Sequence, residues 1–299
     1  MSSTGRVTEE QKNYFIVDDP HGKVIATTSG TLKKKRQRVC TGDIVDYTLI
    51  DEQARRGVIS RIHKRTTHIR RPALANCSRL LCIATFSEPP LNLESLDRLL
   101  VTAHIWGVEP CIIFNKFDLL SDDEKNDQQK IIDVYRRIGY QVFSISSRDG
   151  TGITEVVNHC RNETCACAGL SGVGKSTLLS AIFPDRTFRI GSLSEGANRG
   201  THTTTHVSLI PLPEGGYIAD TPGLAFIDLP SIPEEDVVLH FPEIAACIGQ
   251  CRFNNCIHEH EPGCIVAEKV EDGTIVSWRH EHYLKFFSLM REQRRQYRK

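Results

Sequence analysis

Residues 169–176, GLSGVGKS, place three glycines, a lysine and a serine at the spacing G-x-x-x-x-G-K-[ST]. The glycines let the backbone bend so that its N–H groups face an anion. Lys175 would neutralise β- and γ-phosphate charge, and the Ser176 hydroxyl would bind Mg²⁺. A strand-like run, ETCACAG, precedes the loop, and a helix-like run, STLLSAIF, follows it and would add the positive end of its dipole. The pattern predicts a phosphate-binding loop, with a plain Gly-rich turn as the alternative. The expected nucleotide contacts are Gly169, Leu170, Ser171, Gly172, Val173, Gly174, Lys175, Ser176 and Thr177.

Two further segments could complete a magnesium site beside this loop. Asp220 and Gly223 belong to DTPG, which follows the apolar run GGYIA. A carboxylate at a strand end can hold Mg²⁺ through water, and Gly223 can offer its N–H to the γ-phosphate, although DTPG alone is also a common turn sequence. Residues 199–207, RGTHTTTHV, lie between the phosphate loop and DTPG. Thr204, with Thr203 as the alternative, is the expected second protein ligand of Mg²⁺, in a loop ordered by GTP and released by GDP.

A guanine-recognition motif, NKFD, follows the apolar run PCIIF. The Asp118 carboxylate can accept hydrogen bonds from guanine N1–H and the 2-amino group. Adenine lacks this donor pair, so the carboxylate would select GTP over ATP. Asn115 and Lys116 would brace the loop and pack on the base. Ser146 and Ser147, after the run YQVFSI, form a less specific second loop to the base.

The guanine motif precedes the phosphate loop in this chain, which reverses the order of most GTP-binding proteins. A nucleotide site needs its loops adjacent at one edge of a sheet, whatever their order along the chain. Cutting a GTPase sheet in one loop and joining its old ends preserves the site. The observed order therefore predicts a circularly permuted GTPase domain, whose threonine-rich loop and DTPG lie next to the C-terminal segment.

Four side chains suited to zinc lie close together near the C-terminus, namely Cys251, Cys256, His258 and Cys264. Three thiolates and one imidazole are typical of tetrahedral Zn²⁺, and four protein ligands leave no open position, which favours a structural role. The loop is too short for a core of its own, so the metal would supply its stability. Disulfides and loose thiols are the alternatives. The scattered cysteines elsewhere in the chain are expected to be small buried hydrophobes.

The residues that carry this chemistry fall into an α/β chain of three parts. Residues 1–70 contain short alternating apolar runs separated by turn residues, which predict a small β-barrel. In residues 71–230, strands alternate with helices, which predicts a mainly parallel sheet. Residues 231–299 hold the Cys/His cluster, an aromatic helix whose apolar side chains are expected to pack, and a basic tail.

Composition narrows the choice of partners. The 299 residues include 37 basic and 37 acidic side chains, so nucleic-acid binding would need local patches. The basic segment 32–38, LKKKRQR, and the basic tail are candidates, and a solvated loop is the alternative for the first. We find no signal peptide and no apolar run of the roughly 20 residues that a membrane span needs. We therefore expect a soluble cytoplasmic protein that acts as a monomer without membrane contact.

Taken together, these motifs resemble one family, the ribosome small subunit-dependent GTPase A family of bacteria. The matching segments are IIFNKFDLL, AGLSGVGKSTLL, GTHTTTHV, ADTPG and CRFNNCIHEHEPGC, in this order, with RRPALAN and SLDRLL as further signatures. Cys77-Ser78 departs from the family, whose members often have an Asp after Ala-Asn. The resemblance implies an N-terminal OB fold, a permuted GTPase domain and a C-terminal zinc domain. It also implies binding to the small ribosomal subunit and its rRNA late in assembly, with subunit-stimulated hydrolysis of GTP.

The group that activates water differs from the usual one. Many GTPases use a glutamine just after DxxG, where this chain has Leu224, which cannot orient water. His202 in the threonine-rich loop is the expected catalytic residue, as the resemblance also suggests. His206 is the alternative, and a packing or capping role for His202 is a third possibility.

Two other functions compete with an RNA-activated GTPase of assembly. One is a nucleotide-switched RNA-binding module whose hydrolysis is incidental. Single-turnover hydrolysis with and without subunits would separate these two functions. The other is a metabolic P-loop kinase, which the NKFD motif and the lack of an evident small-substrate pocket disfavour.

Overall fold

The computed structural model describes residues 2–34, 36–186, 188, 207–220 and 229–297. The N-terminal part is a barrel of five strands, β1 (Ser2–Glu10), β2 (Phe15–Asp19), β3 (Gly22–Thr28), β4 (Ile44–Asp51) and β5 (Arg56–Ile62). Around the barrel the order is β1, β2, β3, β5 and β4, and β1 closes it by pairing with β4. Only the β3–β5 pairing is parallel. The barrel confirms the expected N-terminal OB fold.

The basic segment 32–38 differs from the expected loop, because its first turn is helical. Helix α1 spans Gly30–Lys34. The Ser29 hydroxyl accepts the Leu32 N–H at 3.4 Å, and the Leu32 side chain is buried in the barrel core. This single apolar anchor and the cap fold the segment onto the barrel, while Lys34, Arg36 and Arg38 remain exposed.

A short hairpin, β6 (His68–Arg70) and β7 (Ala73–Ala75), leads from the barrel into the second sheet. That sheet contains β8 (Arg79–Ala84), β9 (Glu109–Phe114), β10 (Gln141–Ser144), β11 (Thr164–Ala168), β12 (Ser208–Pro211) and β13 (Tyr217–Asp220). Its order is β10-β9-β8-β11-β13-β12, and all pairings are parallel except that of β12 with β13. This is the mainly parallel α/β sheet that the sequence predicts.

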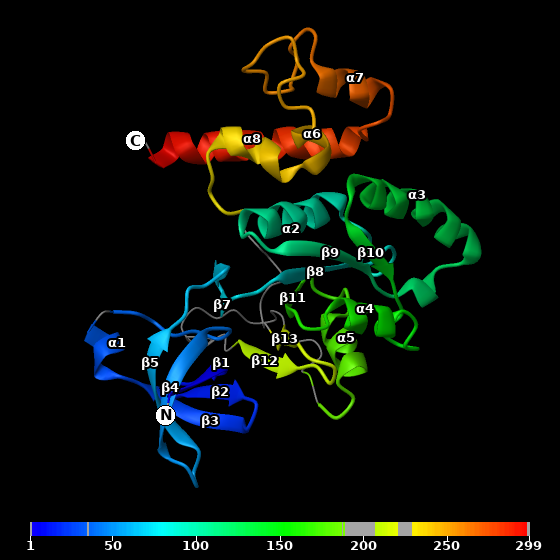
Figure 1. The fold of residues 1–299 in the computed structure, drawn as a ribbon. Helices are drawn as coiled ribbons and strands as arrows, with labels where there is room; N and C mark the ends of the chain where they lie inside the picture. The colour runs from blue at the N-terminus through cyan, green and yellow to red at the C-terminus, as the bar shows by residue number, and fades with distance from the viewer. Residues whose placement is uncertain (1, 35, 187, 189–206, 221–228, 298–299) are drawn as a thin grey trace, which may run out of the picture.

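Helices cover both faces of this sheet (Figure 1). They are α2 (Leu93–Ile105) and α3 (Asp122–Ile138) on one face, and α4 (Ile153–His159) and α5 (Lys175–Ile182) on the other. The alternation along β8 shows how the two cores separate. Leu80 and Cys82 pack toward α2 and α3, whereas Leu81 and Ile83 pack toward α4 and α5.

The barrel and the α/β sheet are continuous. Strand β1 pairs with β12 where Glu9 faces Ser208, so the hydrogen-bonded ladder runs through all eleven strands of both parts. The N-terminal barrel is therefore joined by backbone pairing to the strand that follows the threonine-rich loop.

The C-terminal part stacks on α2 (Figure 1). Its elements are the 3₁₀ helix η2 (Glu234–His240), α6 (Pro242–Ala245), α7 (Ile265–Glu271) and α8 (Ser277–Tyr297). Tyr283, Phe286 and Met290 of α8 are buried together with Val101 of α2. The aromatic stripe of α8 is therefore packing surface, as expected.

An ionic cluster lies within this contact. Arg279 of α8 and Asp97 of α2 are both fully buried, with Nη1 2.7 Å from Oδ1. Arg279 also donates from Nε and Nη2 to the Glu243 carboxylate at 2.6 and 3.1 Å. The other Asp97 oxygen lies 2.6 Å from His282 Nδ1. Although burial disfavours the charged guanidinium, the two carboxylates raise the pKa of Arg279 well above its ordinary value.

The scattered cysteines are buried free thiols, as expected: Cys40, Cys77, Cys82, Cys111, Cys160, Cys165 and Cys167. Burial raises the pKa of Cys40 and of Cys77 to about 12, so these thiols stay protonated at neutral pH. Within the described ranges, no helix is both long and apolar enough to cross a bilayer.

Candidate nucleotide and metal sites

The phosphate loop joins β11 to α5, and two of its glycines lie where a side chain would collide. Gly174 has φ +91°, and a Cβ there would lie 2.3 Å from Asn115 Nδ2. Gly169 has φ +155°, and its Cβ would lie 2.2 Å from the carbonyl oxygen of Ile83. The loop therefore approaches the backbone of β8 and the guanine motif too closely for any residue but glycine. Helix α5 begins at Lys175, as the sequence predicts.

Lys175 folds back over this loop. Its Nζ donates to the carbonyl oxygens of Gly169 and Leu170, each at 2.8 Å. Burial lowers the pKa of the ammonium group. Charged phosphate oxygens are stronger acceptors than these carbonyls, so a bound phosphate could replace them as the partners of Lys175 Nζ. Ser176 and Thr177 follow it in the first turn of α5, and both are half-buried, whereas Ser171 and Gly172 at the loop tip are exposed.

Asn115 connects the guanine motif to both other loops of the site. Its Nδ2 donates to the Val173 carbonyl of the phosphate loop at 2.9 Å. Its Oδ1 accepts the Ser147 N–H at 3.0 Å and the Ser147 hydroxyl at 2.8 Å. Ser146 closes its own turn by accepting the Asp149 N–H at 3.3 Å. The side chain of Asn115 is buried, so one amide holds three segments that are far apart in the sequence.

Lys116 and Asp118 are the other two residues of the motif with an expected role at the base. Lys116 has φ +61°, and its Nζ donates to the Glu88 carbonyl at 2.7 Å. Asp118 lies in the 3₁₀ helix η1 (Phe117–Leu119) with its side chain exposed, where it can meet an incoming base. The sequence did not reveal the contribution of Glu88, because a backbone carbonyl leaves no residue-type signal.

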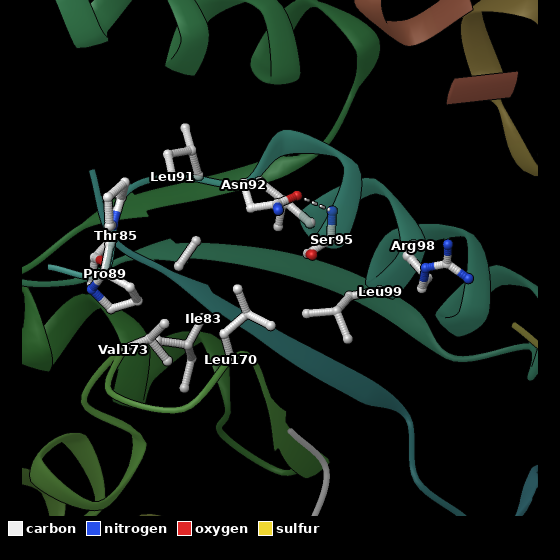
Figure 2. A pocket seen from close by; sticks show the side chains of 13 residues that line it. Ile83, Thr85, Pro89, Leu91, Asn92, Ser95, Arg98, Leu99, Leu170 and Val173 are labelled. Atoms are coloured by element: carbon white, nitrogen blue, oxygen red, sulfur yellow. Dashed lines mark hydrogen bonds between the residues drawn. The ribbon is translucent and has the colours of Figure 1, made fainter. Parts of the chain in front are cut away.

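Sequence reasoning also missed a cavity of about 200 Å³ that lies between the phosphate loop and α2 (Figure 2). Leu170 and Val173 of the phosphate loop line one side. Asn92 and Ser95, at the start of α2, line another, and the Asn92 side chain accepts the Ser95 N–H at 2.8 Å. The lining comes from three separate segments and is mainly apolar, so no local sequence pattern predicts the cavity.

Asp220 lies at the same edge of the sheet as the phosphate loop, because β13 runs parallel to β11 and ends there. Burial raises the pKa of its carboxyl group above the ordinary value. Ser208 of β12 faces Asp220 in the ladder. The remaining predicted residues lie outside the described part of the chain: His202, Thr203, Thr204, His206, Gly223 and Leu224.

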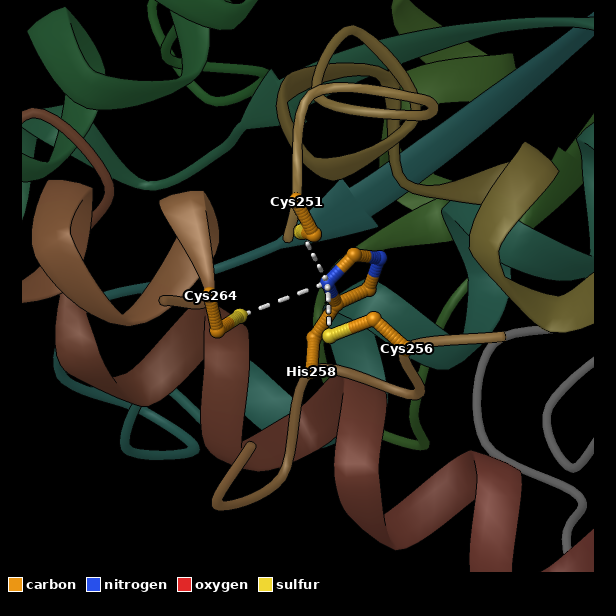
Figure 3. A group of neighbouring side chains, drawn as sticks. All are labelled: Cys251, Cys256, His258 and Cys264. Carbon is orange, nitrogen blue, oxygen red and sulfur yellow. Dashed lines mark hydrogen bonds between the residues drawn. The ribbon is translucent and has the colours of Figure 1, made fainter. Parts of the chain in front are cut away.

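The four predicted zinc ligands converge in the C-terminal part (Figure 3). Their ligand atoms all lie within 4.8 Å of one another, and His258 Nδ1 is 3.5 Å from each of the three sulfurs. With Zn–S and Zn–N bonds of about 2.3 and 2.0 Å at tetrahedral angles, sulfur and nitrogen ligands stand about 3.5 Å apart. The donor set and its spacing therefore fit a zinc ion.

The loop that carries these ligands is braced by the surrounding chain. The Glu261 carboxylate accepts the backbone N–H groups of Ile257, Glu259 and His260 at 2.7, 2.9 and 3.1 Å. The Tyr283 hydroxyl of α8 donates to the Ile257 carbonyl at 2.9 Å. The metal loop is thereby attached to the same helix that packs on α2.

Comparison with known proteins decides the family. The family model described as RsgA GTPase matches residues 54–230. The chain belongs to the RsgA GTPase family. A curated protein of Moorella thermoacetica named small ribosomal subunit biogenesis GTPase RsgA is 42% identical over 232 residues, covering 78% of this chain and 79% of its own. The protein of the same name from Staphylococcus carnosus is 35% identical and covers 98% and 99% of the two chains.

Solved structures extend the likeness to the whole chain. The crystal structure of YjeQ from Thermotoga maritima matches with a TM-score of 0.85 at 31% identity and covers 97% of this chain and 99% of that one. YloQ, titled a circularly permuted GTPase, matches with a TM-score of 0.84 at 30% identity and covers 98% and 96%. The permuted GTPase fold inferred from motif order is thus confirmed for this RsgA GTPase.

Proposed function

We propose that this protein hydrolyses GTP to GDP and phosphate on the small ribosomal subunit late in its assembly, and that the subunit stimulates the reaction. As an RsgA GTPase it is a GTP hydrolase of small-subunit biogenesis. The single observation that carries the nucleotide assignment is the bond from Asn115 Nδ2 to the Val173 carbonyl. Through it, a guanine motif and a phosphate loop in reversed chain order meet as one site.

Each loop has a distinct role in this proposal. Asp118 accepts the guanine N1–H and 2-amino hydrogens, while Asn115, Lys116, Ser146 and Ser147 hold the base loops in place. The phosphate loop binds through its backbone N–H groups and through Lys175 Nζ, with the contacts Gly169, Leu170, Ser171, Gly172, Val173, Gly174, Ser176 and Thr177.

Magnesium would be held at the edge of the sheet. GTPases require Mg²⁺ to offset the charge between the β- and γ-phosphates. Ser176 at the start of α5 and Thr204 are the proposed direct ligands, and Asp220 would act through water. The position of Asp220 supports this role, because β13 ends at the same edge of the sheet as the phosphate loop. Gly223 would donate its N–H to the γ-phosphate.

His202 is the proposed catalytic residue, which orients the attacking water. Support comes from the sequence alone: Leu224 occupies the position where other GTPases carry a glutamine, and His202 lies in the threonine-rich loop. Binding to the subunit would then place the imidazole beside the γ-phosphate, which would account for the proposed stimulation of hydrolysis by the subunit.

The C-terminal cluster would hold one structural Zn²⁺ through Cys251, Cys256, His258 and Cys264. Its support is that the four ligand atoms lie within 4.8 Å of one another and that His258 Nδ1 is 3.5 Å from each sulfur. We retain the division of the chain into an RNA-binding barrel at 1–70, a permuted GTPase domain at 71–230 and a zinc domain at 231–299.

Contact with rRNA is proposed at two basic surfaces on a chain of zero net charge. The first is the exposed part of the segment 32–38, in which the Arg38 side chain is 81% exposed. The second is the end of α8, where Arg291 and Arg295 are exposed. The protein would act there as a monomer in the bacterial cytoplasm.

The deciding experiment measures GTP hydrolysis by the purified protein, alone and with purified small subunits, with ATP as the control. Strong stimulation that is specific for GTP supports the proposal. His202→Ala should then retain GTP binding and lose the stimulated turnover, and unchanged stimulation would remove His202 from the mechanism. If subunits bind but leave the wild-type rate unchanged, the chain acts as a nucleotide-switched RNA-binding module instead.

A further inference from the structure

The turn at residues 40–43, hereafter the connector turn, is bonded to three parts of the molecule. Gly42 donates its N–H to the Val7 carbonyl of β1 at 2.8 Å, and the Val7 N–H returns a bond to the Asp43 carbonyl at 2.8 Å. The Ala75 N–H of β7 donates to the Thr41 carbonyl at 2.9 Å. The third contact reaches the residue before β12 of the α/β sheet: the buried Thr41 hydroxyl donates to the Val207 carbonyl at 3.0 Å.

The connector turn has little freedom to move. Gly42 has φ +92°, and a Cβ there would lie 2.0 Å from the Ala75 carbonyl oxygen. The fully buried Asp43 carboxylate accepts from Arg65 Nε at 2.7 Å and Nη2 at 2.8 Å, and also from the Cys40 N–H at 2.9 Å. These bonds fix the backbone of the connector turn. A shift of the turn at one of its contacts would therefore also shift its other contacts.

On its upstream side the connector turn is continuous with an exposed basic surface. Only the buried residues Val39 and Cys40 separate Thr41 from Arg38. Arg65, the residue that clamps Asp43, also donates from Nη2 to the Arg38 carbonyl at 2.8 Å. The Arg38 side chain pairs with Glu10 at 3.1 Å. A phosphate of RNA would compete for this guanidinium and release Glu10, the last residue of β1.

On its downstream side the turn holds the entry to β12. Val207, the last residue of the threonine-rich loop, is buried and lies directly before β12. Its neighbour Ser208 faces Glu9 of β1 on one side and Asp220 of β13 on the other. A single ladder position, Ser208, therefore lies between Glu9 of the barrel and the carboxylate proposed to act on magnesium.

We propose that Thr41 is a positioning residue that couples RNA contact at the barrel to GTP hydrolysis, by fixing the point where the threonine-rich loop enters β12. RNA phosphates engage the exposed basic side chains next to the connector turn, and the Thr41–Val207 bond carries the constraint to the exit of the loop. The inference rests on the proposed function, because it assigns a route to the stimulation by the small subunit.

The test compares Thr41→Val, which keeps the shape and removes the hydroxyl, with Thr41→Ser, which keeps the donor. GTP affinity, subunit affinity, the unstimulated rate and the rate at saturating small subunits are measured for both variants and the wild type. Thr41→Val should keep the first three within about two-fold and lower the stimulated rate about ten-fold, because the bond that passes the constraint from the barrel to β12 is lost; about ten-fold is the size of effect that one buried hydrogen bond can carry. Thr41→Ser should restore stimulation.

Two results would overturn the proposal. One is stimulation of Thr41→Val equal to that of the wild type. The other is an equal fall of the unstimulated and stimulated rates, since the hydroxyl would then serve the site regardless of RNA. If the wild type itself is not stimulated, the proposed function fails separately. Hydrogen exchange of the β12 amides in the free protein then still tests the anchor, because Thr41→Val must speed exchange relative to Thr41→Ser, and unchanged exchange would refute it.

Discussion

Arg279→Met should weaken the packing of α8 on α2 severely, because it leaves two carboxylates without their cation. Asp97 is fully buried and the Glu243 side chain is 11% exposed. Removing one partner of such a buried pair costs about 3–5 kcal/mol, since an uncompensated charge stays behind. Methionine fills much of the arginine stem's volume, so the loss is mainly electrostatic.

Lys285→Met on the same helix is the matched control. It removes an ion pair with Glu94 in which the lysine side chain is 61% exposed. Exposed pairs contribute about 0–1 kcal/mol. The two variants therefore remove one cation each from α8 and differ in burial, which makes burial the variable under test.

Urea unfolding followed by tryptophan fluorescence measures the difference. The chain has two tryptophans, and Trp278 packs on Tyr135 with ring centroids 5.5 Å apart, so a Trp106→Phe background reports the α8 contact. With a slope of about 2 kcal/mol per molar urea, a loss of about 4 kcal/mol lowers the midpoint by about 2 M. The control should shift it by less than about 0.5 M.

Equal midpoints for Arg279→Met and Lys285→Met would refute the electrostatic reasoning. A second check neutralises the two acids that lose the guanidinium: adding Asp97→Asn and Glu243→Gln to Arg279→Met should recover part of the lost stability, since buried amides cost less than buried carboxylates without a balancing cation. No recovery would mean that the guanidinium acts through packing on Phe241, 4.6 Å from its ring centroid, rather than through charge.

Three further predictions concern the metal, the base and the pH. Cys264→Ser should lose bound zinc and destabilise the C-terminal part, whereas Cys247→Ser, which removes a buried thiol outside the cluster, should keep about one zinc per chain in metal analysis. Asp118→Asn should weaken binding of GTP and improve binding of xanthosine triphosphate in a fluorescent-nucleotide competition assay, because xanthine presents a carbonyl in place of the 2-amino donor; unchanged selectivity would contradict the guanine assignment. Burial, with the positive charges of His240 and Arg279, lowers the pKa of His104 to about 4 from about 6.5. Below about pH 6.5 His104 binds a proton in the unfolded chain, whereas in the folded chain it does so only near pH 4. The free energy of unfolding should therefore decrease as the pH falls from about 6.5 to about 4. His104→Gln should reduce this pH dependence when the free energy is measured by urea unfolding at several pH values.

The parts of the site that sequence could predict are those whose chemistry is local. The phosphate loop needs glycines and a lysine at fixed spacing, and the metal cluster needs four donors in one short loop. Gly174 illustrates the reason. Its positive φ and its close approach to Asn115 exclude any side chain, so the backbone geometry of the loop requires glycine and is visible in the sequence.

Contacts between segments far apart in the sequence could not be predicted, because no local sequence pattern identifies the two partners. Nothing around Thr41 identifies Val207 as its partner, and Arg279 lies in a helix whose other charged side chains are mostly exposed. The first turn of the basic segment was missed for a similar reason. One buried leucine and one serine cap outweighed the charge pattern there, because burial in the barrel depends on strands that close only in three dimensions.

The reversed order of the motifs also sets an order in time. On a ribosome that adds roughly 5–20 residues per second, residues 115–118 emerge before residues 169–176, and β12 emerges later still. Strand β1 is made first, yet its partner at Ser208 is among the last pieces of the sheet to appear. A chain interrupted before residue 199 has neither the threonine-rich loop nor β12, the strand that joins the barrel to the nucleotide site. Such a fragment could keep a folded barrel but would lack segments that the proposed RNA-stimulated hydrolysis requires, so the proposed function predicts that only chains completed beyond β12 respond to the subunit.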